Sequence, residues 1–233
     1  MPKYHYQHIF FDLDRTLWDF NANSEITLNQ LYRDYHLQSI FGSFVFFKSR
    51  FEYHNAKLWN AYYQNRIKKE ELMYRRFYLT LKESGADDLE MAIELGQDFI
   101  EISPLQTKTL PQAHETLQYL KDKGYELHII TNGFNEVQYK KLSNCKLISF
   151  FTKIITSEDA GANKPSPIIF DYAIKKSGAA KSKSIMVGDD LKTDIAGARK
   201  SEIDQIYFNS HKSKHKSNPT YEINHLIEIT EIL

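Results

Sequence analysis

Two acidic residues, Asp12 and Asp14, come directly after the short apolar segment His8–Phe11. Side chains alternate along a strand, so both carboxylates point the same way if the strand continues through them. Two negative charges this close raise the pKa of one carboxyl unless a cation lies nearby, so the pair either shares a proton or binds a metal ion. Because the same short pattern is common in loops, the pair alone leaves catalysis and a plain polar strand end equally open.

A second acidic cluster follows another apolar segment, Ser184–Val187, and contains Asp189 and Asp194. Oxygen ligands at two strand ends, with room for water, suit Mg²⁺ better than zinc or copper. We therefore expect a magnesium site that includes Asp189. Asp194 lies in the first turn of the next expected helix, where the helix N-terminus also stabilises a carboxylate. A simple helix-start carboxylate stays open as an alternative for Asp194.

Phosphate-binding groups are expected at two further turns. Thr131 and Asn132 follow the apolar segment Leu127–Ile130, and a hydroxyl beside helix-entry amides can hold a phosphate. Lys164 stands just before a proline that is typical of a helix start. Taken singly, these are an ordinary turn and a solvated lysine. Their order along the chain, each at a strand end or the next helix entry, predicts a common phosphate site.

The elements that must position these residues are short apolar strands alternating with helices. Such alternation indicates right-handed crossovers and a doubly wound, Rossmann-like α/β core with a mostly parallel sheet. A final short strand and helix are expected in the last residues, 221–233. The other expected strands are His8–Phe11, Leu127–Ile130, Lys153–Ile155, Ile185–Val187 and Gln205–Phe208.

The chain between the first two strands instead has helical periodicity with long charged and aromatic runs. An all-helical insertion after the first strand is most simply a cap over the carboxyl edge of the sheet, where open α/β sheets bind ligands. We expect residues 18–95 to form this cap, and residues 1–17 and 96–233 the core. Ser24 is a candidate N-cap and Gly85 a helix stop. The expected helices are Ser24–Tyr35, Phe44–Tyr63, Lys69–Ser84 and Leu89–Ile102.

Composition excludes several classes of protein. Thirty basic residues balance thirty acidic ones, so no overall field favours a nucleic acid polymer or an anionic membrane as partner. No apolar run approaches the roughly 18 residues of a membrane span, and the start of the chain does not resemble a signal peptide. The single cysteine, Cys145, rules out an internal disulfide and is expected to be inert. These features predict a cytoplasmic protein.

The ordered motifs resemble those of the haloacid dehalogenase superfamily of phosphohydrolases, and the similarity spans nearly the whole chain. Further similarity, including Ile129–Phe134, Ile169–Ala173, Leu58-Trp59 and Tyr63-Gln64-Asn65, is to the YjjG-type branch of pyrimidine 5′-nucleotidases. The four superfamily motifs match as Asp12-Leu13-Asp14-Arg15-Thr16-Leu17, Thr131-Asn132-Gly133, Lys164-Pro165, and Gly188-Asp189-Asp190 with Asp194.

This resemblance implies a role for each motif. Asp12 would attack phosphorus and form an aspartyl-phosphate, while Asp14 would act as general acid and then base, a role expected to need a raised pKa. Mg²⁺ would be held by Asp12, the main-chain carbonyl of Asp14 and Asp189. Transferring oxygens would contact Thr131, Asn132 and Lys164. Asp194 would orient Lys164 or metal-bound water.

The substrate implied is a small phosphorylated metabolite, in the first place a nucleoside 5′-monophosphate. Arg15, where the superfamily more often has glycine, and Trp59 in the cap are candidate substrate or cap contacts, since aromatic rings can stack on a base. Aromatic residues at helical spacing more often belong to a core, so a place in the cap's core stays open for Trp59. Alternatives are a sugar-phosphate or phosphoglycolate phosphatase, a phosphomutase, a dehalogenase, and a catalytically silent phosphate-binding protein. Asp14 argues against the dehalogenase, which needs neither a metal nor a second acid. The oligomeric state is not predicted.

Overall fold

The computed structural model describes residues 6–64 and 66–233, so Asn65 of the cap motif lies outside the described residues. The chain divides into two compact units. The helical unit comprises Asn21–Gln106, and the core unit comprises the residues up to Phe20 together with Thr107–Leu233. The boundary expected at residue 95 falls inside a continuous helix, α5 (Leu89–Ile102), so the helical unit continues to the end of the turn that follows this helix.

The core unit contains a six-stranded sheet in the order β3-β2-β1-β4-β5-β6, with every neighbouring pair parallel. This confirms the doubly wound, Rossmann-like fold expected from the alternating pattern. The sequence order reverses on either side of β1, which places the crevice for ligands at the carboxyl ends of the central strands. The strands are β1 (His8–Phe11), β2 (Glu126–Thr131), β3 (Lys153–Thr156), β4 (Ser184–Gly188), β5 (Asp204–Phe208) and β6 (Tyr221–Ile223).

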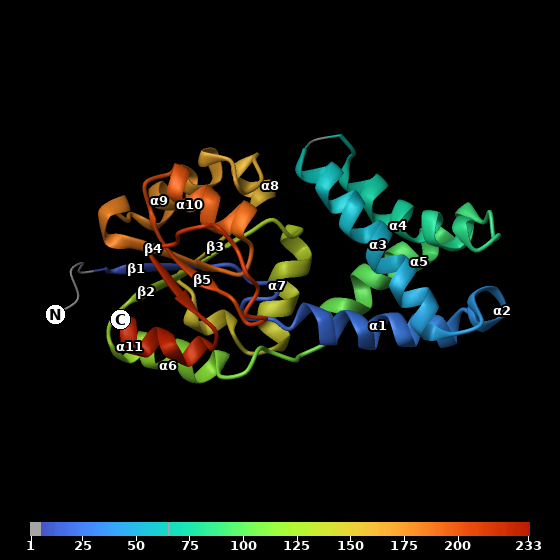
Figure 1. Ribbon diagram of the computed structural model, residues 1–233, viewed down its shortest axis with the longest axis horizontal. Helices are drawn as coiled ribbons and strands as arrows, with labels where there is room; N and C mark the ends of the chain where they lie inside the picture. Colours follow the sequence, from blue (N-terminus) through green and yellow to red (C-terminus); the bar gives the residue numbers. More distant parts are fainter. Residues whose placement is uncertain (1–5, 65) are drawn as a thin grey trace. The chain divides into compact units, whose positions relative to one another are not determined.

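Alternate residues of the central strands enter two separate apolar layers. Ile9 and Phe11 of β1 pack in one layer with residues of α6, α7 and α11, and Phe10 packs in the other with residues of α9 and α10. Figure 1 shows α9 and α10 on one face of the sheet and α6 and α11 on the other. The helices of the core unit are α6 (Ala113–Asp122), α7 (Asn135–Asn144), α8 (Ser157–Ala160), α9 (Pro167–Ser177), α10 (Ala196–Lys200) and α11 (Ile229–Ile232).

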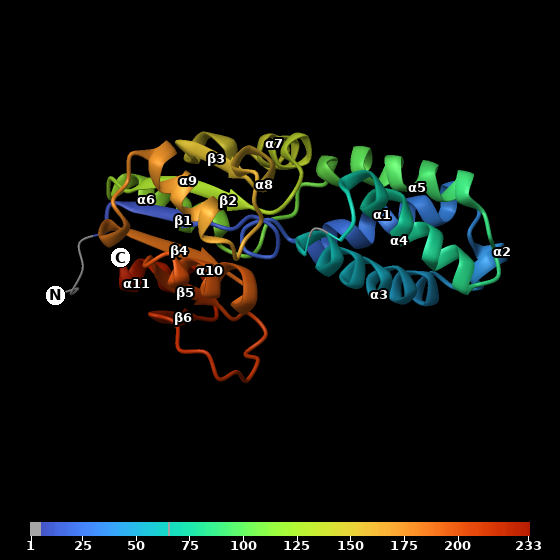
Figure 2. The same ribbon diagram turned by 90° about the horizontal axis from the view of Figure 1, so that it is seen from above.

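The helical unit has a core of its own, rich in phenylalanine, in which Phe51 and Phe77 lie 4.8 Å apart between ring centroids. Figure 2 shows α3, α4 and α5 running alongside one another. Its helices are α1 (Phe20–Asp34), α2 (Gln38–Phe41), α3 (Phe44–Tyr63), α4 (Lys69–Glu83) and α5. Across residues 6–64 and 66–233, none of the helices is both long and apolar enough to cross a bilayer.

The expectation that Ser24 caps the first helix was wrong. Helix α1 begins four residues earlier, at Phe20, and Ser24 is buried within it. Local sequence favoured serine as a cap because its hydroxyl can accept from helix amides, but Phe20, where the helix begins, packs against the apolar core of the core unit, and Asn23 and Ser24 are buried. Gly85, by contrast, does follow the end of α4, with a φ of 88° that glycine adopts without strain.

Candidate active site

Asp12 follows β1 and lies at the centre of the carboxyl edge of the sheet. Its amide donates to the Val187 carbonyl of β4 at 2.9 Å, which fixes the first residue after the strand. Its carboxylate accepts a hydrogen bond from the buried ammonium of Lys164, with 2.6 Å between Oδ1 and Nζ. The same ammonium lies 2.7 Å from Asp194 Oδ1 and donates to the Ile130 carbonyl at 2.8 Å. The Lys164 ammonium therefore links the third motif, to which it belongs, with the first and the fourth.

The Thr16 hydroxyl lies between the first and fourth motifs. It is 3.3 Å from Asp12 Oδ2 and 3.3 Å from Asp189 Oδ1, so these two carboxylate oxygens face a common point. Oxygen atoms of Asp12, Asp189 and Asp194 all lie within 4.8 Å of one another. Both oxygens of Asp194 are already bound, Oδ1 by Lys164 and Oδ2 by the Asp190 amide, whereas Lys164 binds only Oδ1 of Asp12. Asp12 Oδ2 and Asp189 Oδ1 are therefore the oxygens best placed to bind a hard divalent cation.

The protonation behaviour of the cluster fits a cation site. Burial, together with the charges of Asp12 and Asp194, raises the pKa of Asp189 to about 8. Burial also raises the pKa of Asp12 to about 7, because the opposing effect of Lys164 is smaller. For Lys164, burial favours the neutral amine, but Asp12 and Asp194 outweigh it and raise its pKa. Burial and mutual repulsion both disfavour the charged carboxylates, which is why their pKa values are raised. A bound cation would offset both effects.

Asp14 is held from a different direction, by helix α7. Lys141 Nζ lies 2.6 Å from Asp14 Oδ1, and the Gln138 amide donates to Asp14 Oδ2 at 2.9 Å. Burial favours the protonated acid, but Lys141 and Gln138 stabilise the carboxylate more strongly and lower the pKa of Asp14. The expected raised pKa was therefore wrong for this arrangement, because nothing in the sequence indicated that a lysine contacts this carboxylate.

Two glycines make room for these contacts. A Cβ on Gly133 would lie 1.8 Å from Gln138 Nε2, and one on Gly188 would lie 2.3 Å from Asp194 Oδ2. Neither glycine has a positive φ, so their role here is to leave space and not to form a special turn. The side chains of Gln138 and Asp194 each occupy the volume that a Cβ would need.

Asn132 contacts the main chain of Lys164 on both sides. The Lys164 amide donates to Asn132 Oδ1 at 2.7 Å, and Asn132 Nδ2 donates to the Lys164 carbonyl at 3.1 Å. Its carboxamide therefore fixes the lysine turn. The Thr131 hydroxyl accepts from the Gly133 amide at 3.1 Å and from Gln138 Nε2 at 2.8 Å. Asp194 also accepts from the Asp190 amide at 3.1 Å.

The two candidate substrate contacts, Arg15 and Trp59, belong to different units of the chain. Arg15 is exposed, has a φ of 66°, and stacks its guanidinium 4.3 Å from the centroid of the Phe20 ring. Trp59 lies on α3 in the helical unit, half-buried, with its ring centroid 5.5 Å from that of Tyr63. The positive charge of Arg15 favours the ionised forms of Asp14 and Asp189.

Gln138, Lys141 and Thr16 are the site residues for which sequence analysis assigned no role. Gln138 and Lys141 stand three residues apart on α7, a spacing that places both on one face of a helix. This helix follows the Thr131 turn directly, so a polar pair on its inward face was the available signal. A lysine and a glutamine in a helix rich in polar residues more often face solvent, so this pair could not be recognised as part of the site from the sequence.

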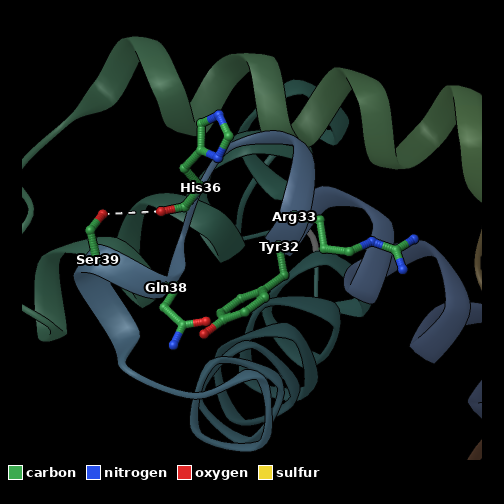
Figure 3. A pocket seen from close by; sticks show the side chains of 5 residues that line it. All are labelled: Tyr32, Arg33, His36, Gln38 and Ser39. Carbon is green, nitrogen blue, oxygen red and sulfur yellow. Dashed lines mark hydrogen bonds between the residues drawn. The ribbon is translucent and has the colours of Figure 1, made fainter.

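A surface pocket of about 420 Å³ lies in the helical unit, lined by Tyr32, Arg33, His36, Gln38 and Ser39 (Figure 3). All five residues come from α1, α2 and the turn between them, and the Ser39 hydroxyl donates to the His36 carbonyl at 3.0 Å. None of the four motifs contributes to this pocket. It contains no carboxylate pair, and we assign it no part in the chemistry.

A parallel sheet with a nucleophile-type aspartate after β1, a buried lysine and a carboxylate cluster after β4 defines a hydrolase of the haloacid dehalogenase type. The chain belongs to the haloacid dehalogenase-like hydrolases, whose family model matches residues 9–208. This confirms the resemblance seen in the sequence motifs.

Several relatives match over nearly their full length. Pyrimidine 5′-nucleotidase PynA of Streptococcus pneumoniae is 30% identical over 221 residues, which cover 94% of this chain and 91% of that protein. Pyrimidine 5′-nucleotidase YjjG of Escherichia coli is 30% identical, with 97% and 96% of the two chains covered. The crystal structure of the putative HAD-hydrolase YfnB from Bacillus subtilis bound to magnesium has a TM-score of 0.88 at 29% identity, with 98% of each chain covered.

Proposed function

We propose that the protein is a Mg²⁺-dependent phosphomonoester hydrolase that acts through an aspartyl-phosphate and takes nucleoside 5′-monophosphates as substrates. The observation that carries the proposal is the buried Lys164 ammonium, paired with Asp12 and Asp194 beside an Asp189 carboxylate that shares the Thr16 hydroxyl with Asp12. This arrangement supports a nucleophile, a phosphate-binding cation and a divalent-cation site at one sheet edge.

Asp12, Asp189 and the main-chain carbonyl of Asp14 are the groups that would hold Mg²⁺. When bound, Mg²⁺ supplies positive charge that offsets the repulsion between an anionic nucleophile and an anionic phosphate. The convergence of Asp12 Oδ2 and Asp189 Oδ1 on Thr16, and the raised pKa of Asp189, support this choice of ligands.

The chemistry divides into two displacements at phosphorus. A carboxylate oxygen of Asp12 forms a bond to phosphorus while the ester P–O bond breaks, and the leaving alkoxide takes a proton from Asp14. Because Lys141 and Gln138 favour the Asp14 carboxylate in the free site, this step requires that Asp14 take up a proton when the phosphate dianion binds. Water then attacks the aspartyl-phosphate, Asp14 accepts the proton of that water, and inorganic phosphate leaves as Asp12 is regenerated. Lys164 and the Thr131 hydroxyl bind the phosphoryl oxygens, and Asn132 and Asp194 keep Lys164 in place through the contacts described above.

Nucleoside monophosphates are proposed because the matches to proteins named pyrimidine 5′-nucleotidases extend over both units of this chain. A relative named glyceraldehyde 3-phosphate phosphatase, from Methanothermobacter thermautotrophicus, is 31% identical over 58% of this chain. A match of that length speaks for shared core chemistry more than for a shared substrate. The presence of Asp14 in the site supports phosphate ester hydrolysis over dehalogenation, because an alkoxide leaving group needs a proton and a halide does not.

The test is phosphate release with Mg²⁺ across pyrimidine and purine 5′-monophosphates, sugar phosphates and phosphoglycolate, with 2-chloropropionate as a dehalogenase substrate. We expect highest kcat/KM for nucleoside monophosphates and loss of activity with EDTA. Asp12→Asn keeps the size of the side chain but removes the nucleophile, and is expected to lower kcat by more than about 1,000-fold.

Asp122→Asn is the matched control, because the exposed Asp122 side chain lies at the end of α6, accepts from Gln118 Nε2 and belongs to none of the four motifs. Activity that persists both in EDTA and in Asp12→Asn contradicts the mechanism. A clear preference for sugar phosphates with Mg²⁺ dependence intact contradicts only the choice of substrate.

A further inference from the structure

Both oxygens of the Asp14 carboxylate are bound by side chains of one helix, α7. Oδ1 lies 2.6 Å from Lys141 Nζ, and Oδ2 accepts from Gln138 Nε2 at 2.9 Å. With both oxygens bound, the carboxyl group can neither rotate about χ2 nor swing away without breaking one of these contacts. We propose that Lys141 and Gln138 are positioning residues that hold Asp14 in the orientation from which it exchanges protons with the substrate oxygen. This inference rests on the proposed phosphatase function.

The ion pair between Lys141 and Asp14 differs from a surface salt bridge. Lys141 is only 4% exposed, and its ammonium lies 4.1 Å from the centroid of the Trp18 ring, which is fully buried. The indole face and the Asp14 carboxylate thus fix the end of a flexible side chain on two sides. A solvated lysine would lose conformational entropy for little gain, whereas a buried pair keeps its geometry because water does not compete for it.

Gln138 extends this arrangement to the phosphate-binding turn. Its Nε2 donates both to Asp14 Oδ2 and, at 2.8 Å, to the Thr131 hydroxyl, and its side chain is fully buried. The amide fits there only because Gly133 has no Cβ. The Gln138 amide therefore sets the distance between the proton-transferring carboxylate and the turn that binds the phosphoryl oxygens.

The contribution of a positioned acid can be measured by comparing substrates whose leaving groups differ in their need for a proton. A nucleoside alkoxide is a poor leaving group that needs the proton from Asp14, whereas p-nitrophenolate leaves without one. The parameter kcat/KM covers steps up to the first irreversible one, here the transfer of phosphorus to Asp12. Losing the orientation of Asp14 should therefore lower kcat/KM for uridine 5′-monophosphate but not for p-nitrophenyl phosphate.

The experiment compares kcat/KM for these two substrates in wild type, Lys141→Met and Gly133→Ala with saturating Mg²⁺. For Lys141→Met we expect about a 10- to 100-fold loss with uridine 5′-monophosphate and a loss of less than about 3-fold with p-nitrophenyl phosphate. Gly133→Ala keeps every polar group but displaces the Gln138 amide. It should also lower kcat/KM for uridine 5′-monophosphate relative to kcat/KM for p-nitrophenyl phosphate. Lys141→Arg, which keeps the cation, should recover part of the loss.

Lys140→Met is the matched control, because Lys140 is the exposed neighbour on the same helix and should leave both substrates unchanged. An equal loss for the two substrates, or no loss, in Lys141→Met overturns the inference. If Lys141→Met does not fold, the ratio measured for Gly133→Ala decides in its place. Failure of the proposed function looks different, because wild type would then release no phosphate from either substrate.

Discussion

At the scale of single residues, buried cations organise the site. Lys164 pairs with Asp12 and Asp194, and Lys141 pairs with Asp14, so each carboxylate proposed for covalent or proton-transfer chemistry has its own ammonium group. Removing either lysine would leave a buried carboxylate without its partner, which costs far more than the pair itself contributes to stability. The two lysines are thus tied to the fold as well as to the chemistry.

Another buried titratable residue, His128, lies on β2. His128 is fully buried, with its Nε2 3.1 Å from His8 Nδ1 and its ring 4.8 Å from that of Phe10. Burial, together with the neighbouring His8, lowers the pKa of His128 to about 4. Its Nδ1 has no hydrogen-bond partner among the described residues, so the folded state favours the neutral ring.

This histidine predicts acid sensitivity. Because the folded pKa lies below the unfolded value of about 6.5, the stabilising contribution is complete above pH 6.5 and is lost as pH falls towards 4. The slope is about 1.4 kcal/mol per pH unit for one such group. Urea unfolding at several pH values should therefore give a flatter pH dependence for His128→Leu between pH 6.5 and 4 than for wild type.

The control for this measurement is His211→Leu, at an exposed histidine, which should keep the wild-type slope. If His128→Leu and wild type lose stability in parallel over that range, His128 is not the group responsible.

At the scale of elements, strands were easier to predict than the contacts of their ends. The expected strand His8–Phe11 matches β1 in both bounds, because buried parallel strands are short apolar runs that turn residues end clearly. Helices α3 and α5 also have the expected bounds, since their apolar periodicity is long. Ser24 failed because tertiary packing extended α1 past the local cap signal.

Which side chains meet at the site was less predictable. Parallel strands bring their carboxyl ends together, so the common location of Asp12, Thr131, Lys164 and Asp189 follows from topology once the strand order is known. The contact of Lys141 with Asp14 does not, because it depends on the rotation of α7 about its axis. That rotation is set by Leu142 and its neighbours packing under the sheet, which no local pattern encodes.

Helices α4 and α5 lie close together at Gly96. A Cβ at this position would lie 2.6 Å from the Met73 carbonyl oxygen and 3.1 Å from Tyr74 Cα, both main-chain atoms of α4. We predict that Gly96→Ala lowers the free energy of unfolding by about 1–3 kcal/mol, because two backbones must move apart. This loss should exceed the gain of about 1 kcal/mol in helix propensity. Thermal or urea unfolding measures it.

Gln97→Ala is the comparison, since Gln97 is the exposed next residue of α5 and should change stability by less than about 0.5 kcal/mol. A Gly96→Ala protein as stable as wild type would show that the two helices do not depend on this close approach.

At the scale of the whole molecule, the two units have separate apolar cores, and all groups proposed to bind Mg²⁺ belong to one of them, the core unit. A ligand that binds only the folded state stabilises the unit that holds its site. Hydrogen exchange with and without the metal is therefore expected to change protection in the core unit first.

We predict that millimolar Mg²⁺ raises the thermal midpoint of the wild-type protein and that Asp189→Asn abolishes this rise. Without Mg²⁺, Asp189→Asn should be at least as stable as wild type, because burial and the nearby carboxylates penalise the charge of Asp189. Opposite effects of one substitution with and without the metal are not expected from a merely structural aspartate. An equal response of wild type and Asp189→Asn to Mg²⁺ would contradict the assignment.

The pairing of lysines and carboxylates leaves the site with a net negative charge. Asp12, Asp14, Asp189 and Asp194 carry four formal negative charges when ionised, against the two positive charges of Lys141 and Lys164. The excess of two is the charge that a single divalent cation cancels. A phosphate dianion that arrived first would face this excess, so we expect the proposed Mg²⁺ to bind before the phosphate ester.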